Sequence, residues 1–174
     1  MQRNLLLDRD GTICHRHHYL TRPDQVTLIN GVGEALRSAC ARGLQIYVLT
    51  NQSAVGRGLL SQSGLNRINE RLIQLLERYD VHVSDILSCP HIPEDRCDCR
   101  KPRVGLFRQL QMEHGITPEL SVMVGDAPTD EAAAHAWGCR FVAICGELFS
   151  ANEPKGLWKS SPQEAIQLAI DLLS

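Results

Sequence analysis

The sequence predicts a single α/β domain, a three-layer α/β/α sandwich whose central sheet is mainly parallel. Three observations predict it. The chain has 174 residues, the size of one ordinary domain with a core of its own. Short apolar segments alternate with segments of helical periodicity, which is the pattern of right-handed βαβ units. Unusual polar residues follow the apolar segments, at the ends of strands where parallel sheets bind ligands.

Each strand is predicted from a short apolar run, and each helix from apolar residues three or four positions apart. Strands are expected at 4–8, 44–49, 81–89, 120–124 and 140–144. Helices are expected at 31–42, 61–79, 104–114, 129–137 and 162–173. Gly43, Gly115 and Gly138 are stop signals after three of these helices, and Ser161 followed by Pro162 is a start signal for the last. The stretches 14–30, 89–103 and 146–160 are expected to be irregular.

Composition narrows the functional class. Hydrophobic residues make up 43% of the chain and charged residues 22%, as is typical of a globular protein, and the net charge is −2. Such a charge does not favour bulk attraction to nucleic acid or to an anionic membrane. No apolar run approaches the roughly 20 residues that span a bilayer, and no secretory signal precedes the first strand. We therefore expect a cytoplasmic monomer without a nucleic-acid or membrane partner.

The first predicted strand runs directly into two carboxylates, Asp8 and Asp10, and then into Gly11. If the strand geometry continues this far, both carboxylates point to the same side. Two carboxylates this close repel each other unless a cation or a proton lies between them, and Mg²⁺ prefers oxygen ligands. A carboxylate held against a metal-bound phosphoryl group can attack it and form an acyl phosphate. The alternative is an ordinary Asp–Gly turn that only ends the strand.

A second candidate site lies in the irregular stretch 89–103. Its four soft ligands fall within eleven residues: Cys89, His91, Cys97 and Cys99. Such a set is typical of a closed tetrahedral Zn²⁺ site, and its spacing differs from that of a zinc finger. We therefore predict a structural zinc ion without a catalytic role. It would fix the loop and direct Arg100 and Lys101, which follow the last ligand.

The segment Asp8-Arg9-Asp10-Gly11-Thr12 after an apolar strand resembles the first motif of the haloacid dehalogenase (HAD) phosphatase superfamily. The other three motifs follow in the expected order, at Thr50, at Lys101 and at Gly125-Asp126 with Asp130. The resemblance implies a HAD-like Rossmannoid fold without a large cap domain. It also implies a Mg²⁺-dependent phosphatase that works through a covalent aspartyl-phosphate.

The resemblance gives catalytic roles to four of the matched residues. Asp8 would be the nucleophile, and Asp10 would protonate the leaving alkoxide and then deprotonate the attacking water. Thr50 would donate its hydroxyl to the phosphoryl oxygens. Lys101 would offset the repulsion between the phosphate and the nucleophile.

The same resemblance implies the magnesium ligands. They would be the carboxylates of Asp8 and Asp126 together with the backbone carbonyl of Asp10. Asp130 lies one helical turn beyond Asp126. For Asp130, a helix N-cap and a direct contact with the metal are both open.

The zinc loop followed by Arg100-Lys101-Pro102 resembles one cap-less HAD branch. This branch contains the D-glycero-D-manno-heptose-1,7-bisphosphate 7-phosphatases and the histidinol-phosphatases, and the segments 50–53 and 55–58 are similar to the heptose enzymes. The resemblance implies removal of the 7-phosphate of this phosphorylated sugar, a step toward ADP- or GDP-heptose. Residues 13–25 would form a substrate loop. Substrate contacts would fall on nine residues: Arg16, His17, His18, Tyr19, Asn51, Gln52, Ser53, Arg57 and Arg100.

Two departures from the heptose enzymes leave alternatives open. Five residues separate His91 from Cys97, a short loop more like that of the histidinol-phosphatases. Ala127 also stands where relatives often have Lys or Arg. Histidinol-phosphate phosphatase is therefore the nearest alternative.

Two more distant alternatives are disfavoured. A DNA 3′-phosphatase would need a basic groove with stacking rings, whereas the net charge is −2 and aromatic residues make up 5%. A non-catalytic zinc scaffold would not need the four charged motif residues together, namely Asp8, Asp10, Lys101 and Asp126.

Overall fold

The computed structural model describes residues 2–146, 148–149 and 156–174. All pairings between the strands described are parallel, and the strands form one sheet in the order β3-β2-β1-β4-β5-β6. The strands are β1 (Asn4–Leu7), β2 (Gln45–Asn51), β3 (Asp85–Cys89), β4 (Ser121–Gly125), β5 (Arg140–Ile144) and β6 (Leu157–Lys159). The helices are α1 (Val32–Ala41), α2 (Ser53–Gly56), α3 (Gln62–Glu77), α4 (Gly105–His114), α5 (Pro128–Trp137) and α6 (Pro162–Leu172). Short 3₁₀ turns lie at Pro23–Gln25, Pro93–Asp95 and Pro118–Leu120.

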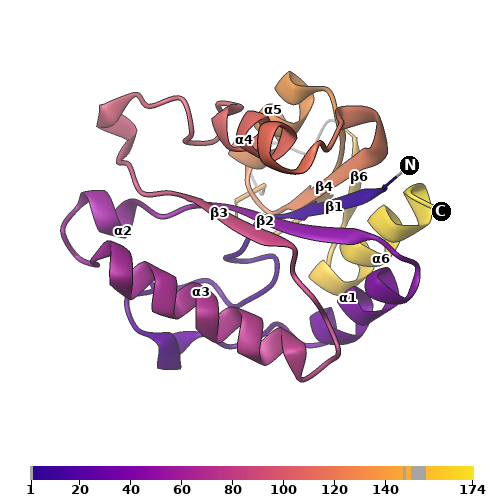
Figure 1. The fold of residues 1–174 in the computed structure, drawn as a ribbon, viewed down its shortest axis with the longest axis horizontal. Helices are drawn as coiled ribbons and strands as arrows, with labels where there is room; N and C mark the ends of the chain where they lie inside the picture. Colours follow the sequence, from indigo (N-terminus) through magenta and orange to yellow (C-terminus); the bar gives the residue numbers. More distant parts are fainter. Residues whose placement is uncertain (1, 147, 150–155) are drawn as a thin grey trace.

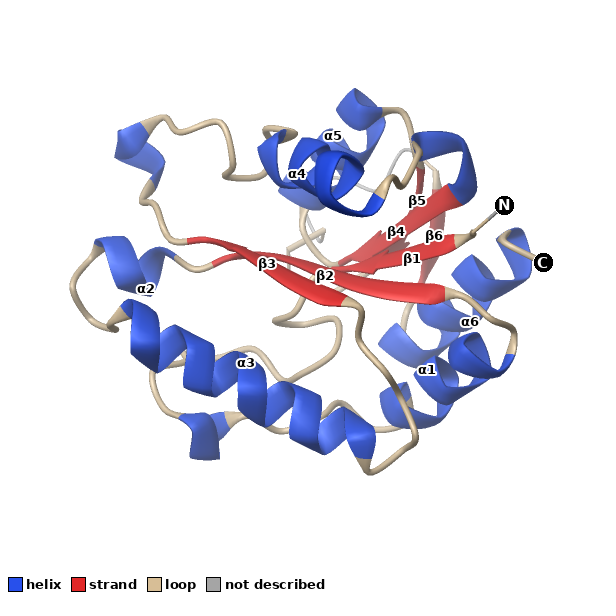
Figure 2. Ribbon diagram, viewed as in Figure 1, coloured by secondary structure: helices blue, strands red, loops and turns tan. Residues whose placement is uncertain are grey.

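Different helices cover the two faces of the sheet, so the layers are those of an α/β/α sandwich. Figure 1 shows α4 and α5 on one face, and α1, α3 and α6 on the other. The same layers are visible in Figure 2, where the strands lie between the two helical layers. In β1, Leu5 and Leu7 pack into the core under α1, α3 and α6, whereas Leu6 packs into the core under α4 and α5. This alternation is what a strand buried on both faces requires.

The central position of β1 gives the acidic turn a rigid base. All four residues of β1 are buried, and β1 pairs with β2 on one side and β4 on the other. Full burial of a leucine side chain contributes roughly 1.5–3 kcal/mol, so the strand is held firmly before the two carboxylates begin. The chain runs outward from β1 to β3 and then returns to β4 on the opposite side. This reversal creates a crevice at the carboxyl ends of β1 and β4, where ligands bind in such sheets.

The structure confirms the predicted α/β class and every predicted helix and strand, with shifted ends. The third strand, for example, begins at Asp85 and not at Val81. The cap of the last helix is also confirmed, because Ser161 accepts a hydrogen bond from the backbone N–H of Glu164. No helix among the described residues is long and apolar enough to cross a membrane.

Two elements were not predicted from the sequence, α2 and β6. The expectation that 146–160 is irregular is wrong at Leu157–Lys159, which pairs with β5; residues 147 and 150–155 of that stretch lie outside the described residues. All three residues of β6 are exposed, so this edge strand shows no buried face in the sequence. Four residues of α2 are likewise too few for a helical period to be recognised.

Candidate active site

A cavity of about 460 Å³ opens where β1, β2 and β4 end. Every predicted catalytic and substrate-binding residue except Arg57 lines it. Arg57 follows α2 and is exposed to solvent, and it is not among the residues that line the cavity. Further lining residues that sequence reasoning did not single out are Leu20, Ala54, Pro128, Thr129 and Leu148. Pro128 and Thr129 could have been inferred from their place directly after the Gly125-Asp126 motif, whereas nothing in the sequence marks Leu148.

Lys101 lies between two carboxylates at the base of this cavity. Its Nζ is 2.7 Å from Asp8 Oδ1 and 2.7 Å from Asp130 Oδ1, and its side chain is 1% exposed. Burial raises the pKa of Asp8 to about 6, against the opposing charge of Lys101. Burial would lower the pKa of Lys101, but the charges of Asp130 and Asp8 raise it above its usual value. The lysine is therefore a fixed cation beside the predicted nucleophile.

The backbone of Lys101 is held as firmly as its side chain. The side chain of Asn51, the last residue of β2, donates from Nδ2 to Lys101 O at 3.0 Å. Its Oδ1 accepts from the Lys101 backbone N–H, also at 3.0 Å. Asn51 thus fixes the position of the lysine, and its predicted contact with substrate stays a prediction.

Asp10 has a different environment from Asp8. The guanidinium of Arg9 donates to both of its carboxylate oxygens, and Gln52 Nε2 donates to Oδ2 at 2.7 Å. Burial opposes ionisation here, but the charge and hydrogen bonds of Arg9 lower the pKa of Asp10. Gln52 also donates to Thr50 Oγ1 at 2.8 Å, which links Asp10 to the hydroxyl predicted to bind the phosphoryl group. The two carboxylates of the acidic turn are therefore set up differently, one beside a lysine and one in an arginine fork.

Carboxylate oxygens gather around the predicted magnesium position. Oxygens of Asp8, Asp126 and Asp130 lie within 4.8 Å of one another, and Asp126 Oδ1 is buried without a hydrogen-bond partner. An unpaired buried oxygen beside further carboxylates suits a hard divalent cation such as Mg²⁺. Gly11 has φ +87°, and a Cβ there would lie 1.9 Å from Asp126 Oδ2, so only glycine allows this approach. The carboxylate of Asp10 faces Arg9, which leaves the Asp10 backbone carbonyl as the atom predicted for the metal.

Asp130 joins two of these features. Its Oδ2 accepts the backbone N–H of Ala127 at 3.2 Å at the start of α5, while its Oδ1 pairs with Lys101. A Cβ on Gly125 would lie 2.5 Å from Asp130 Oδ2, so the glycine of this motif makes room for the carboxylate. The N-cap of α5 is Ala127 and not Asp130, so that prediction is wrong in position. Asp130 is the third residue of the helix, and its side chain satisfies the N-cap backbone N–H while it also holds the lysine. Its oxygens are also close enough to Asp8 and Asp126 to share a cation with them.

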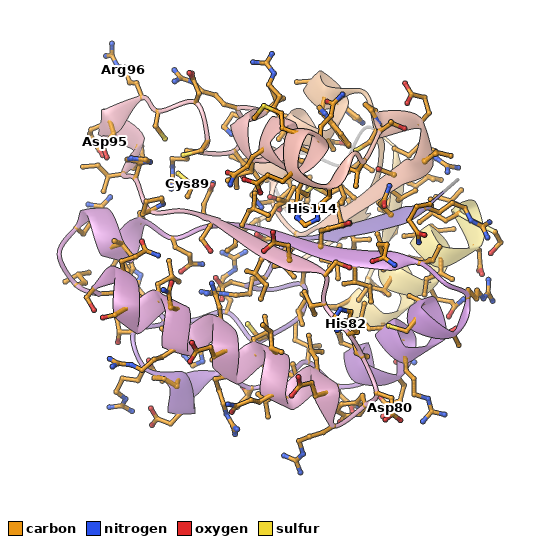
Figure 3. All side chains as sticks on the ribbon, in the orientation of Figure 1. Asp80, His82, Cys89, Asp95, Arg96 and His114 are labelled. Carbon is orange, nitrogen blue, oxygen red and sulfur yellow. The ribbon has the colours of Figure 1, made fainter. Side chains whose placement is uncertain are left out.

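The four predicted zinc ligands converge in the loop after β3. The ligand atoms of Cys89, His91, Cys97 and Cys99 lie within 4.8 Å of one another, with sulfur–sulfur separations of 3.2 to 3.6 Å. These separations exceed the roughly 2.0 Å of a disulfide and fit sulfurs that share one tetrahedral ion. Figure 3 shows Cys89 at the base of the loop and Asp95 and Arg96 at its outer end. The cluster could hold a zinc ion. In the sequence it begins at the end of β3 and ends two residues before Lys101.

The predicted substrate loop bends back over the acidic turn. Arg16 donates from Nη2 to Asp126 Oδ2 at 2.6 Å and to the backbone carbonyl of Asp10 at 3.1 Å. The rings of His18 and Tyr19 meet edge to face, 4.5 Å apart between centroids. On the opposite rim, Arg100 donates to His91 O at 3.2 Å, which ties it to the Cys/His loop. The cavity is thus lined by cationic and hydrogen-bonding groups from two loops.

A buried lysine lies between Asp8 and Asp130, and an acidic cluster lies beside it at the switch point of a parallel sheet. This arrangement is typical of a HAD-like phosphatase. The HAD-hydrolase-like family model matches residues 98–166. The chain belongs to the family of D-glycero-β-D-manno-heptose-1,7-bisphosphate 7-phosphatases, as its curated relatives show. It is 38% identical over 143 residues to the enzyme of that name from Haemophilus ducreyi, covering 78% of this chain and 79% of the relative. It is 36% identical over 146 residues to that from Pseudomonas aeruginosa, covering 83% and 82%.

A solved structure agrees over nearly the full length. The D,D-heptose 1,7-bisphosphate phosphatase from B. bronchiseptica, complexed with magnesium and phosphate, superposes with a TM-score of 0.91. The two chains are 25% identical, and the match covers 98% of this chain and 99% of the other. The predicted HAD-like fold is therefore confirmed along the described chain.

Proposed function

We propose that this chain removes the 7-phosphate of D-glycero-D-manno-heptose 1,7-bisphosphate through a phosphorylated aspartate at Asp8. The observation that supports this substrate is the 38% identity, over 78% of the chain, to a heptose-1,7-bisphosphate 7-phosphatase. The site geometry supports the reaction class. Asp8, Asp130 and the buried ammonium of Lys101 line one cavity, and the carboxylate of Asp126 lies close to both aspartates. Histidinol phosphate fits the cavity less well, because its cationic amine would be repelled by Arg16 and Arg100 on the rim.

In the first half-reaction, an oxygen of Asp8 attacks the 7-phosphorus and the bond from phosphorus to the sugar oxygen breaks. Arg9 favours the ionised form of Asp10, so Asp10 must be protonated when the substrate is bound; it then gives this proton to the departing alkoxide. Lys101 offsets the charge that gathers around the phosphoryl group. In the second half-reaction, Asp10 takes a proton from a water molecule, which attacks the phosphorus of the acyl phosphate. The phosphorus–Asp8 bond then breaks, and inorganic phosphate and the free carboxylate are released. Thr50 would donate its hydroxyl to the phosphoryl oxygens throughout.

Two metals fit the donor sets of the chain. Asp8, Asp126 and the carbonyl of Asp10 would hold Mg²⁺, with Asp130 near enough to contribute. When bound, Mg²⁺ would supply positive charge to the phosphoryl oxygens. The Cys/His cluster would hold Zn²⁺ as a structural ion, because four protein ligands leave no open position.

We also propose that residues 1–174 act as one domain, with 13–25 as the substrate loop and 89–103 as the zinc-binding loop. We propose that the enzyme acts as a monomer. Synthesis of a sugar nucleotide from phosphorylated sugars would place the enzyme in the cytoplasm.

The test is a comparison of kcat/KM for the heptose bisphosphate, histidinol phosphate and a small generic ester, each with Mg²⁺ and with EDTA. We expect the bisphosphate to be the best substrate and chelation to abolish turnover. A higher kcat/KM for histidinol phosphate would overturn the substrate assignment. Undiminished turnover in EDTA would overturn the metal dependence.

A further inference from the structure

Arg9 is the charged residue of the acidic turn to which the proposed reaction gives no role. Its relative exposure is 0%, although an unpaired guanidinium is costly to bury. Its Nε donates to Asp10 Oδ1 at 3.2 Å and its Nη2 to Asp10 Oδ2 at 2.9 Å, so the fork grips both oxygens of its neighbour. Its Nη1 donates to Asn69 Oδ1 at 3.0 Å. Each guanidinium nitrogen thus has an acceptor.

Asn69 connects this fork to the body of the domain. It is a half-buried residue of α3, and its Nδ2 donates to Ser88 Oγ in β3 at 3.4 Å. Arg9 is therefore anchored, through Asn69, to a helix and a strand to which we assign no catalytic residue. On its other sides, the Asp10 carboxylate accepts from Gln52 Nε2 at 2.7 Å and from Cys14 Sγ at 3.5 Å.

We propose that Arg9 and Asn69 are positioning residues, which fix the orientation of the Asp10 carboxylate for proton transfer to the leaving group. A bidentate fork sets the plane of a carboxylate as well as its distance, which a lysine in the same place does not. A general acid must lie within hydrogen-bond reach of the oxygen that it protonates, and small misplacements are costly. This inference rests on the acid–base role proposed for Asp10.

Two substrates with different leaving groups can distinguish a misplaced general acid from general damage to the site. A sugar alkoxide needs a proton as it departs, whereas p-nitrophenolate departs readily without one. In Asn69→Leu, which keeps the size of the side chain but removes the acceptor, kcat/KM for the sugar phosphate should fall by about 10- to 100-fold. For p-nitrophenyl phosphate it should fall by less than about 3-fold, because the nucleophile is untouched. Asn66→Leu, an exposed position one turn earlier on α3, is the matched control and should change neither value.

Arg9→Lys is the second variant, and it decides the question if Asn69→Leu does not fold. It keeps the buried charge but not the fork, so the same selective loss on the sugar phosphate is expected. Equal losses on both esters, or no loss on either, would overturn the positioning role. Asp10→Asn serves as the reference: if it too lacks the selective loss, the acid role itself fails. If Asp10→Asn shows the selective loss and the two other variants do not, only the inference about Arg9 and Asn69 fails.

Discussion

Arg16 and Asp126 form an ion pair of 2.6 Å across 110 residues of sequence. The same guanidinium nitrogen reaches the backbone carbonyl of Asp10 at 3.1 Å. Both acceptors belong to groups that we propose as magnesium ligands, the Asp126 carboxylate and the Asp10 carbonyl. The arginine and a divalent cation would therefore compete for the same two groups.

Replacing Arg16 by glutamine should strengthen Mg²⁺ binding to the substrate-free enzyme. The Arg16 side chain is 41% exposed, so solvent limits the pair to about 0.5–1 kcal/mol, or about a 2- to 5-fold change in Kd. Titration calorimetry with MgCl₂ measures it directly. Arg22→Gln is the control, because Arg22 pairs with Asp24 at the surface of the same loop. Weaker Mg²⁺ binding in Arg16→Gln would show that the two cations do not compete.

Asp8→Asn should abolish turnover and leave the fold in place. An amide keeps the shape of the side chain but cannot form an acyl phosphate, so kcat should fall by about 10⁴-fold or more. Lys101 keeps its pair with Asp130, which limits the loss of stability. Acid-quenched wild type should carry a phosphate on Asp8 by mass spectrometry, and the variant should carry none. Wild-type-like turnover in protein free of deamidated Asp8 would exclude the covalent mechanism.

Purified active protein should contain about one zinc per chain, as four protein ligands imply. Cys97→Ser should lower Tm by about 5–10 °C, which corresponds to about 2–3 kcal/mol in a domain of this size. Activity should fall with it, because the loop carries Lys101. Cys40→Ser, a half-buried thiol of α1 outside the cluster, should keep both zinc and activity. Active protein that lacks zinc would contradict the structural role.

Arg100→Ala should discriminate between substrates. We expect kcat/KM to fall by about 10-fold or more for the bisphosphate and much less for a small ester, because charged contacts recognise the larger substrate. Arg103→Ala is the matched control: Arg103 also donates to a carbonyl of the Cys/His loop, at Cys97 O, but does not line the cavity. Zinc content must be equal in both variants. Equal losses on both substrates would argue against a recognition role for Arg100.

The site residues that could be predicted from the sequence are those whose positions follow from the order of the parallel strands. Asp8, Thr50 and Asp126 each lie at or just beyond the end of a strand, and parallel neighbours bring such ends together. Arg9 could not be placed this way, because charged residues are mostly exposed and burial of this one depends on Asn69, sixty residues later. The use of Asn51 as a clamp depends equally on a tertiary contact, with Lys101.

Because Asn51 binds the backbone of Lys101, the position of this lysine does not depend on the length of the Cys/His loop. Asn51 grips the Lys101 backbone from β2, while Asp8 and Asp130 grip its ammonium. None of these anchors lies in the outer turn 93–96, which is exposed. Insertions at that turn would lengthen the loop without moving the ammonium. The length of this loop is therefore independent of the placement of Lys101, and the outer turn is a suitable place to graft a peptide tag.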